Sequence, residues 1–295
     1  MRRKIVKQGN SALTITLPSE WAKKFNLKPG DEVDVEEEQS FLKVASGFKG
    51  EKKVEIDITE LNDTLVWTYI IAAYRKGYDE IKLKFRKEQI KLVQEVVNAL
   101  LGLAIVEQSQ DSCTIKDLSE FPAEKEFKNL VRRIFYLLEE MALSSFKALE
   151  QKNKEALRNI EFQDYNINKF SNFCLRLINK KNLSSSLDFV ISELENIGDE
   201  YTRLALDLSQ EKSLKISKEV LDLFEETNNF FISFHEFYYN FNNKKSVEMV
   251  EKKNKFNKKI NSVKPNKEET IVIYHLSKII HLIINIEERI IMMHL

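Results

Sequence analysis

Hydrophobic and polar residues alternate in short segments over the first fifty residues. The segment 13–17 (LTITL) has a strict period of two, which is typical of a strand with one buried face. Short segments at 5–6, 33–35 and 41–44 predict three further strands. Between them, residues 18–27 begin with a proline and place apolar side chains on one side of a short helix. The pattern predicts the order strand, strand, short helix, strand, strand.

The next seventy residues combine strand patterns with helix patterns. Two strand-like segments are each followed by a helical pattern that ends at a single glycine, Gly77 or Gly102. Thr59 is placed to cap the first of these helices, and a hairpin is predicted within 105–115. The two glycines are isolated and form no phosphate-binding loop. We predict a small α/β domain over 51–120 that serves as a dimerising spacer, with a sensor role as the alternative.

From Phe127 onward the apolar residues recur at intervals of three and four. One such run extends to Ala142, and another extends from Val220 to Phe241. Each of these helices leads into two more, so the pattern predicts a group of three helices twice. The chain has only 7 glycines and 4 prolines among its 295 residues, which also favours helix. We predict a helical domain over 124–295 with two three-helix repeats.

The most apolar stretch, at 271–293, is interrupted by Lys278 and by charges at 287–289. Its longest charge-free piece near the C-terminus is too short to cross a bilayer, so we predict a core helix and no membrane span. The opening residues MRRKIV contain two arginines but lack the apolar segment of an export signal. We therefore expect a cytoplasmic protein.

The residue types that carry catalysis show no recognisable arrangement. Cys113 and Cys174 lie far apart without metal or redox spacing, and we expect two buried thiols. The four histidines include no pair four residues apart of the kind that binds zinc. No nucleophile motif or Gly-rich phosphate loop is present. We predict that the protein is not an enzyme.

Charge is sorted along the N-terminal segment although the whole chain is neutral, with 46 basic and 46 acidic residues. Residues 1–30 contain seven basic residues and one acidic residue, whereas 31–46 contain six acidic residues and one basic residue. A segment sorted in this way can present one basic face to a polyanion. Fifty residues in two hairpins are also too few to close a core alone, so we expect a dimer.

Three short motifs make the N-terminal segment specific. Residues 9–11 (GNS), 17–21 (LPSEW) and 27–33 (LKPGDEV) together resemble the swapped-hairpin family of AbrB, SpoVT and MazE. The resemblance implies a homodimer over 1–48 that binds double-stranded DNA with basic residues of the first strand and nearby loops. The residues assigned to DNA on this basis are Arg2, Arg3, Lys4, Lys7, Asn10, Ser11, Lys23 and Lys24. Lysine and arginine contact phosphates, and arginine also reads guanine edges. The alternatives are a solvated terminus or a hairpin that only dimerises.

Two motifs of the helical domain resemble those of PhoU. Residues 162–168 (FQDYNIN) are similar to the second-helix motif, and residues 194–200 (LENIGDE) are similar to the third-helix motif. A PhoU-like body behind an AbrB-like domain is an arrangement that we associate with archaeal regulators of phosphate uptake. The resemblance implies contact with a phosphate transporter ATPase or a signalling partner.

PhoU proteins bind metal ions through carboxylates on facing helices, so the same resemblance raises a metal site. Glu195 and Asp199 are four residues apart and share a helix face, which Glu161 and Asp164 could reach from the neighbouring helix. The family aspartate falls on Asn168 here. The second repeat has no acidic residue at the corresponding places, which hold Lys253, Asn257, Ser277 and His281. We expect no required cofactor, with a divalent or iron ion at the four carboxylates as the alternative.

These patterns predict a multidomain, mainly α-helical protein. It has an N-terminal swapped-hairpin β domain, a small α/β middle domain and a C-terminal PhoU-like pair of three-helix bundles. We predict a dimeric DNA-binding transcriptional regulator of phosphate uptake. The alternatives are an adaptor that does not bind DNA and docks on a transporter or signalling partner, or a metal-binding protein.

Overall fold

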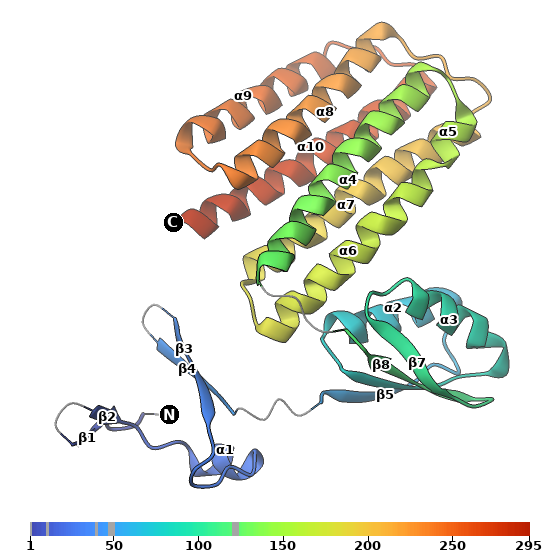
Figure 1. Cartoon of the computed structure of the whole chain (residues 1–295). Helices are drawn as coiled ribbons and strands as arrows, with labels where there is room; N and C mark the ends of the chain where they lie inside the picture. Colours follow the sequence, from blue (N-terminus) through green and yellow to red (C-terminus); the bar gives the residue numbers. More distant parts are fainter. Residues whose placement is uncertain (1, 10–11, 39–40, 47–50, 120–123) are drawn as a thin grey trace. The chain divides into compact units, whose positions relative to one another are not determined.

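A computed structural model describes residues 2–9, 12–38, 41–46, 51–119 and 124–295 (Figure 1). The chain divides into two compact units, Met1–Glu51 and Lys52–Leu295, here called unit 1 and unit 2.

Unit 1 consists of two separate hairpins and one short helix. Its elements are β1 (Val6–Gln8), β2 (Ala12–Thr14), α1 (Ser19–Lys24), β3 (Val33–Glu38) and β4 (Phe41–Ser46). Strand β1 pairs antiparallel with β2, and β3 pairs antiparallel with β4. The predicted order of elements is confirmed, although β2 ends three residues before the alternating segment does.

The apolar side chains of unit 1 are left uncovered within one chain. Leu13 is 69% exposed and Leu42 is 59% exposed, and α1 has no buried residue. The register of the second hairpin pairs Val35 with Val44, and Leu42 lies two residues from Val44 on the same face. The second hairpin therefore carries an apolar face that the described part of unit 1 leaves largely exposed, and Leu13 of the first hairpin is exposed as well.

Unit 2 begins with a four-stranded sheet and two helices. The elements are β5 (Lys53–Asp57), α2 (Asp63–Arg75), β6 (Glu80–Lys84), the 3-10 turn η1 (Lys87–Gln89), α3 (Ile90–Asn98), β7 (Leu103–Gln108) and β8 (Ser112–Asp117). The strand order is β5-β6-β8-β7, with β5 and β6 parallel and the other pairs antiparallel. Buried residues of α2, α3 and the strands form one core between the helices and the sheet. The predicted strands, helices and final hairpin are confirmed.

The predicted cap of α2 is wrong. Asn62 caps the helix, because its side-chain oxygen accepts a hydrogen bond from the Leu65 amide at 3.0 Å. Thr59 instead donates its hydroxyl to Asp57 Oδ1 at 2.7 Å. The Asp57 carboxylate at the end of β5 thus accepts the hydrogen bond of the Thr59 hydroxyl, which is then not available to cap the helix. The N-cap lies three residues after Thr59.

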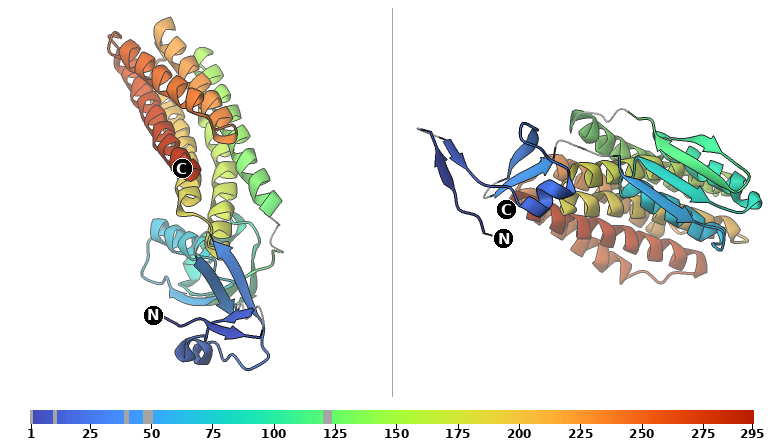
Figure 2. Two further views of the ribbon diagram at one scale, coloured as in Figure 1. Left: turned by 90° about the vertical axis from the view of Figure 1, so that its left-hand side faces the viewer. Right: turned by 90° about the horizontal axis from the view of Figure 1, so that it is seen from below.

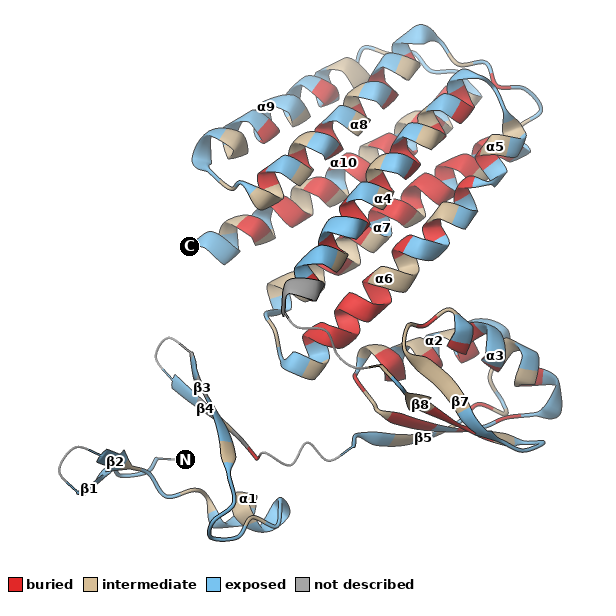
Figure 3. Cartoon of the chain, in the orientation of Figure 1, coloured by how far each residue is buried: buried red, intermediate tan, exposed pale blue. Residues whose placement is uncertain are grey.

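Seven helices complete unit 2. They are α4 (Glu124–Glu150), α5 (Lys154–Arg158), α6 (Ile160–Lys181), α7 (Ser185–Gln210), α8 (Lys218–Tyr239), α9 (Asn243–Ile260) and α10 (Lys267–His294). The long helices run side by side, and their buried residues face one another (Figures 2 and 3). The repeats correspond to α4, α6 and α7 and to α8, α9 and α10, with the short α5 inserted in the first. The prediction of two three-helix groups is confirmed.

Helix α10 is long and apolar enough, by length and composition, to cross a membrane. In this fold it packs against α7 and α8, where Val272, Leu276 and Ile283 are fully buried. These contacts confirm the prediction of a core helix. Cys113 and Cys174 are also buried and free, as expected, and burial raises the pKa of Cys113 to about 11.

A buried cation connects the sheet to the helices. The Arg176 side chain of α6 is fully buried, and its Nη2 donates to Asp117 Oδ2 at 2.7 Å. It also donates to the backbone oxygens of Tyr74 at 2.7 Å and Tyr78 at 2.8 Å. One turn later, Lys180 forms ion pairs with Asp79 and Asp117. These contacts place the sheet and the helices in one unit, and the boundaries predicted at 51–120 and 124–295 stay predictions.

Electrostatics around Asp117 agree with this arrangement. Burial raises the pKa of this carboxyl, but hydrogen bonds from Ser119 and Arg176 outweigh burial and hold the pKa below its usual value. Gly77, with a φ of +84°, lies against Lys180, where a Cβ atom would come within 2.6 Å of the Lys180 Cγ. The glycine at the end of α2 therefore also allows α6 to approach.

We predict that Arg176→Met lowers the free energy of unfolding by about 3–5 kcal/mol, because it removes the guanidinium that donates to buried Asp117 and to two backbone oxygens. Denaturant titration followed by circular dichroism measures this loss. Lys244→Met is the control, since Lys244 is 88% exposed and 4.0 Å from Glu248, and such pairs contribute less than about 1 kcal/mol. Equal losses in both variants would contradict the proposed role of Arg176.

Candidate functional site

The basic residues assigned to DNA are accessible in unit 1. Four of them precede or lie in β1, and two lie in the last turn of α1. The exposed residues are Arg2, Arg3, Lys4, Lys7, Lys23 and Lys24. None of these six forms an ion pair with the described part of the chain. Asn10 and Ser11 lie outside the described residues.

Each face of the first hairpin carries both polar and apolar side chains. Lys7 lies directly opposite Leu13, and Val6 lies opposite Thr14, so each pair shares a face. The acidic residues of unit 1 belong mainly to β3 and to the segment just before it, on the other hairpin. Basic charge therefore gathers on the chain terminus, the first hairpin and α1, without acidic neighbours in β1 or β2.

The acidic motifs of the helical part meet between α6 and α7. Asp164 is only 8% exposed, and its Oδ2 accepts a hydrogen bond from Asn168 Nδ2 at 2.8 Å. Gly198 of α7 lies against this carboxyl, because a Cβ atom there would be 3.0 Å from Asp164 Oδ1. The glycine of the motif thus lets the two helices approach around a buried carboxyl.

Burial and mutual repulsion change the acidity of this group. Burial raises the pKa of Asp164 to about 7, and the charges of Asp199 and Glu195 act in the same direction. Burial also raises the pKa of Glu195, against the effect of Arg75, and that of Asp199, against the effect of Arg203. These three carboxyls form the acidic cluster.

A cation from the sheet region reaches the acidic cluster. Arg75, in the last turn of α2, donates its Nη2 to both Glu195 oxygens at 2.8 Å. Its Nε donates to Asn172 Oδ1 at 2.6 Å, and Arg203 donates to Asp199 Oδ2 at 2.7 Å. Two of the three carboxylates are thus matched by arginines of the same chain.

This pairing bears on the predicted metal site. Of its four residues, Asp164, Glu195 and Asp199 lie near enough for their charges to interact, whereas Glu161 is exposed. In the part of the chain that the structure describes, no three His, Cys, Asp or Glu side chains are grouped closely enough to hold a metal ion. The metal assignment stays a prediction, and the two arginines supply the positive charge that an ion would bring.

Two features of unit 2 were missed by sequence reasoning. Arg75 lies 120 positions from Glu195, and a basic residue before a terminal glycine is expected at any helix end. His275 of α10 is buried, with Nδ1 2.8 Å from Glu200 Oε1 and Nε2 3.1 Å from Asp207 Oδ2. No spacing along the chain indicates either contact.

Comparison with known families agrees with both sequence resemblances. Residues 6–46 match the model of the MazE family, described as antidote-toxin recognition, bacterial antitoxin, and residues 131–208 match the model of the PhoU domain. A crystal structure of the phosphate transport system regulatory protein PhoU from Streptococcus pneumoniae is similar over 57% of this chain and 94% of that chain. Its sequence is 18% identical and the TM-score is 0.47. Among curated protein sequences, none matches significantly. The predicted MazE-like and PhoU-like parts are confirmed, and the archaeal association stays a prediction.

We predict that Asp164 makes the folded chain less stable as pH rises from about 4 to 7. Its pKa of about 7 lies above the ordinary value of 3.8, so the folded state holds the proton longer than the unfolded state does. The free energy of unfolding of Asp164→Asn, taken relative to that of the parent chain, should rise by about 2–3 kcal/mol from pH 5 to pH 8. Urea titrations at both pH values measure the gain, with Asp222→Asn at an exposed position as the control. A gain independent of pH would contradict the buried carboxyl.

A double-mutant cycle tests the pair between Arg75 and Glu195. Either Arg75→Gln or Glu195→Gln alone leaves one charge of the pair without its partner, whereas the double variant removes both charges. We expect a coupling of about 1–3 kcal/mol in the free energy of unfolding. Arg75→Gln combined with the distant Asp222→Asn should be additive within about 0.5 kcal/mol. A coupling no larger than that of the control would mean that the ion pair does not hold the sheet region to α7.

Proposed function

We propose that the protein is a dimeric DNA-binding regulator of phosphate uptake. The observation that carries the proposal is the state of unit 1, in which apolar strand residues are exposed and the six described basic residues assigned to DNA form no ion pair with the described part of the chain. A MazE-like part in front of a PhoU domain supports a PhoU-like regulator. The proposal also includes operator binding and transcriptional control.

Dimerisation follows from the uncovered hairpins. Full burial of a leucine or valine side chain stabilises a protein by about 1.5–3 kcal/mol, and unit 1 leaves several of them exposed. The exposed apolar residues of its strands include Val6, Leu13, Val35, Phe41 and Leu42. A second copy that interleaves its hairpins with these would supply the missing core. We therefore propose that unit 1 folds stably as a dimer.

DNA contact follows from the basic residues of the same unit. A dimer would carry two copies each of Arg2, Arg3, Lys4 and Lys7. Lys23 and Lys24 would lie on the helix side of the same unit. Each lysine or arginine that neutralises a phosphate releases counterions, so binding weakens steeply as salt rises. Asn10 and Ser11 are assigned to the same surface. Phosphate contacts fix the register, and the arginines can read bases.

The PhoU domain supports the regulatory part of the proposal. Its long helices offer docking surface for a phosphate transporter ATPase or a signalling partner in the cytoplasm. A second candidate function is an adaptor in which unit 1 only dimerises and unit 2 docks. The family model that matches unit 1 is described as antidote-toxin recognition, and recognition of another molecule by this part supports an adaptor as the second candidate.

We predict that Arg3→Ala with Lys4→Ala weakens binding of the full chain to genomic DNA fragments roughly ten- to hundred-fold while the dimer persists. The salt dependence of binding should also become shallower, because fewer phosphates are neutralised. Fluorescence anisotropy at two salt concentrations measures affinity, and analytical ultracentrifugation measures the dimer. Lys91→Ala, at an exposed position of α3, is the matched control.

The outcomes separate the two candidates. A dimer whose DNA affinity is unchanged by the two substitutions contradicts the assignment of this surface. A dimer that binds no DNA at low salt contradicts the regulator and leaves the adaptor. A monomeric parent chain contradicts both candidates.

A further inference from the structure

A groove lies between α4 and α8, the first helices of the two repeats. Its apolar walls include Tyr136, Leu143, Phe146 and Ile232, and its volume is about 450 Å³. Tyr136 is 54% exposed, Leu143 is 50% exposed and Ile232 is 44% exposed. Single apolar residues on a surface are common, whereas several in one groove are typical of an interaction site. Tyr136 and Leu143 lie two helical turns apart, a rise of about 10 Å, which matches side chains two turns apart on a second helix.

The base of the groove is fixed by hydrogen bonds within the chain. Asn228 of α8 donates its Nδ2 to the Ala142 backbone oxygen of α4 at 3.0 Å. The Oδ1 atom of Asn228 accepts a hydrogen bond from the Tyr201 hydroxyl of α7 at 2.8 Å. Both ends of this amide are therefore used to hold α4 and α8 together. A preformed groove binds a partner without the cost of ordering its own backbone.

The charged residues that line the groove are all acidic. They are Glu139, Glu140 and Glu225, and no lysine or arginine of the described residues joins them in the lining. Glu139 lies 2.6 Å from Nδ1 of His235. Glu140 and Glu225 are exposed, and neither forms an ion pair with the part of the chain that the structure describes. Carboxylates around an apolar groove favour a partner that carries lysine or arginine beside its apolar side chains.

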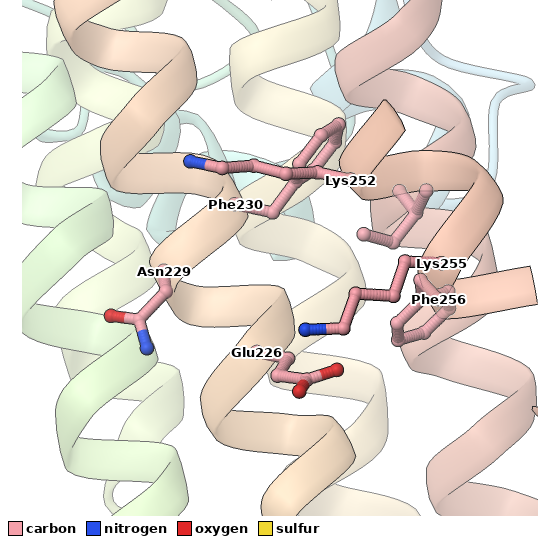
Figure 4. A pocket seen from close by; sticks show the side chains of 7 residues that line it. Glu226, Asn229, Phe230, Lys252, Lys255 and Phe256 are labelled. Atoms are coloured by element: carbon pink, nitrogen blue, oxygen red, sulfur yellow. The ribbon is translucent and has the colours of Figure 1, made fainter. Parts of the chain in front are cut away.

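The opposite side of α8 shows which kind of helix such a surface accepts. There α8 packs against α9, whose last nine residues include five lysines and no acidic residue. Phe256 of α9 is buried, and it lines the same narrow space as Glu226 of α8 (Figure 4). Lys259 forms an ion pair with Glu226, and Lys245 lies 3.8 Å from Glu236. The chain therefore covers one acidic side of α8 with a lysine-rich amphipathic helix, whereas the groove on the α4 side is open.

We propose that the groove between α4 and α8 binds a basic amphipathic helix of a partner protein. The apolar side chains of that helix lie against Tyr136, Leu143 and Ile232. Its lysines or arginines lie beside Glu140 and Glu225, as the lysines of α9 do on the other side of α8. The proposal rests on the regulatory part of the proposed function, for which it names the docking surface and the chemistry of the partner, and it does not depend on DNA binding.

Fluorescence anisotropy of labelled synthetic peptides with the full chain tests the proposal. The probe is an amphipathic helical peptide of leucine and lysine. One control peptide has glutamate in place of lysine, and the other has the same composition in scrambled order. The probe should bind about tenfold more tightly than either control, because only the probe combines an apolar stripe with positive charge.

Surface variants of the chain locate the binding. Glu140→Lys and Leu143→Ser should each weaken binding of the probe roughly fivefold, because one reverses a charge of the groove and the other removes an apolar contact. The matched controls lie on α9 and are Glu251→Lys, at an exposed position, and Val250→Ser, at a valine that is 48% exposed. These controls should change the affinity less than about twofold.

Several results would overturn the groove as the docking site. They are a probe that does not bind at millimolar concentration, a scrambled peptide that binds as tightly as the probe, and equal losses in the α9 controls. A loss of self-association in Glu140→Lys, measured by analytical ultracentrifugation, would assign the groove to a second copy of the chain and would also overturn the proposal. The Arg3→Ala, Lys4→Ala chain should keep its affinity for the probe, so failure of DNA binding and failure of this groove are distinguishable.

Discussion

The fully buried guanidinium of Arg176 is the constraint on which unit 2 depends. A buried charge is tolerated only when its donors find acceptors, and here these come from Asp117 at the end of β8 and from backbone oxygens after α2. Those acceptors belong to the sheet region, whereas the cation belongs to α6. Satisfying one side chain therefore fixes the end of α2 against the helices. Arg75 lies at that same end, which is why it reaches Glu195.

The position of Arg75 also affects the charge balance of the acidic cluster. Carboxyls brought together in a low-dielectric interior must either gain a proton, which removes their charge, or pair with cations. This cluster uses both solutions, because arginines pair with Glu195 and Asp199 while burial raises the pKa of Asp164 to about 7. Gly198 lacks the Cβ atom that would hold α7 away from the Asp164 carboxyl of α6. The cluster can thus reach electrostatic balance with groups of its own chain, and it connects the sheet, α6 and α7.

Periodic features of the chain predicted most of the elements, but contacts between distant residues were not predictable. Apolar spacing and the glycines after α2 and α3 indicate where helices lie, since both are local properties of the backbone. The cap at Thr59 failed because Asp57, only two residues away, competes for the same hydroxyl. The four-residue spacing of Glu195 and Asp199 correctly indicates a shared face. It cannot reveal that the cation on this face is an arginine more than a hundred residues away.

The two units differ in how many of their charged and apolar side chains find partners within the same unit. In unit 2, arginines of the same chain pair with carboxylates such as Asp117 and Glu195, whereas unit 1 exposes both apolar and basic side chains. A chain that needs a second copy to complete its N-terminal core forms the dimer by mass action. Any ligand of unit 2 that changes the tendency of two chains to associate would therefore change the amount of completed unit 1. Regulation of this kind would require no direct contact between a ligand of the helices and the residues proposed to bind DNA, only a difference in the ligand's affinity for single and paired chains.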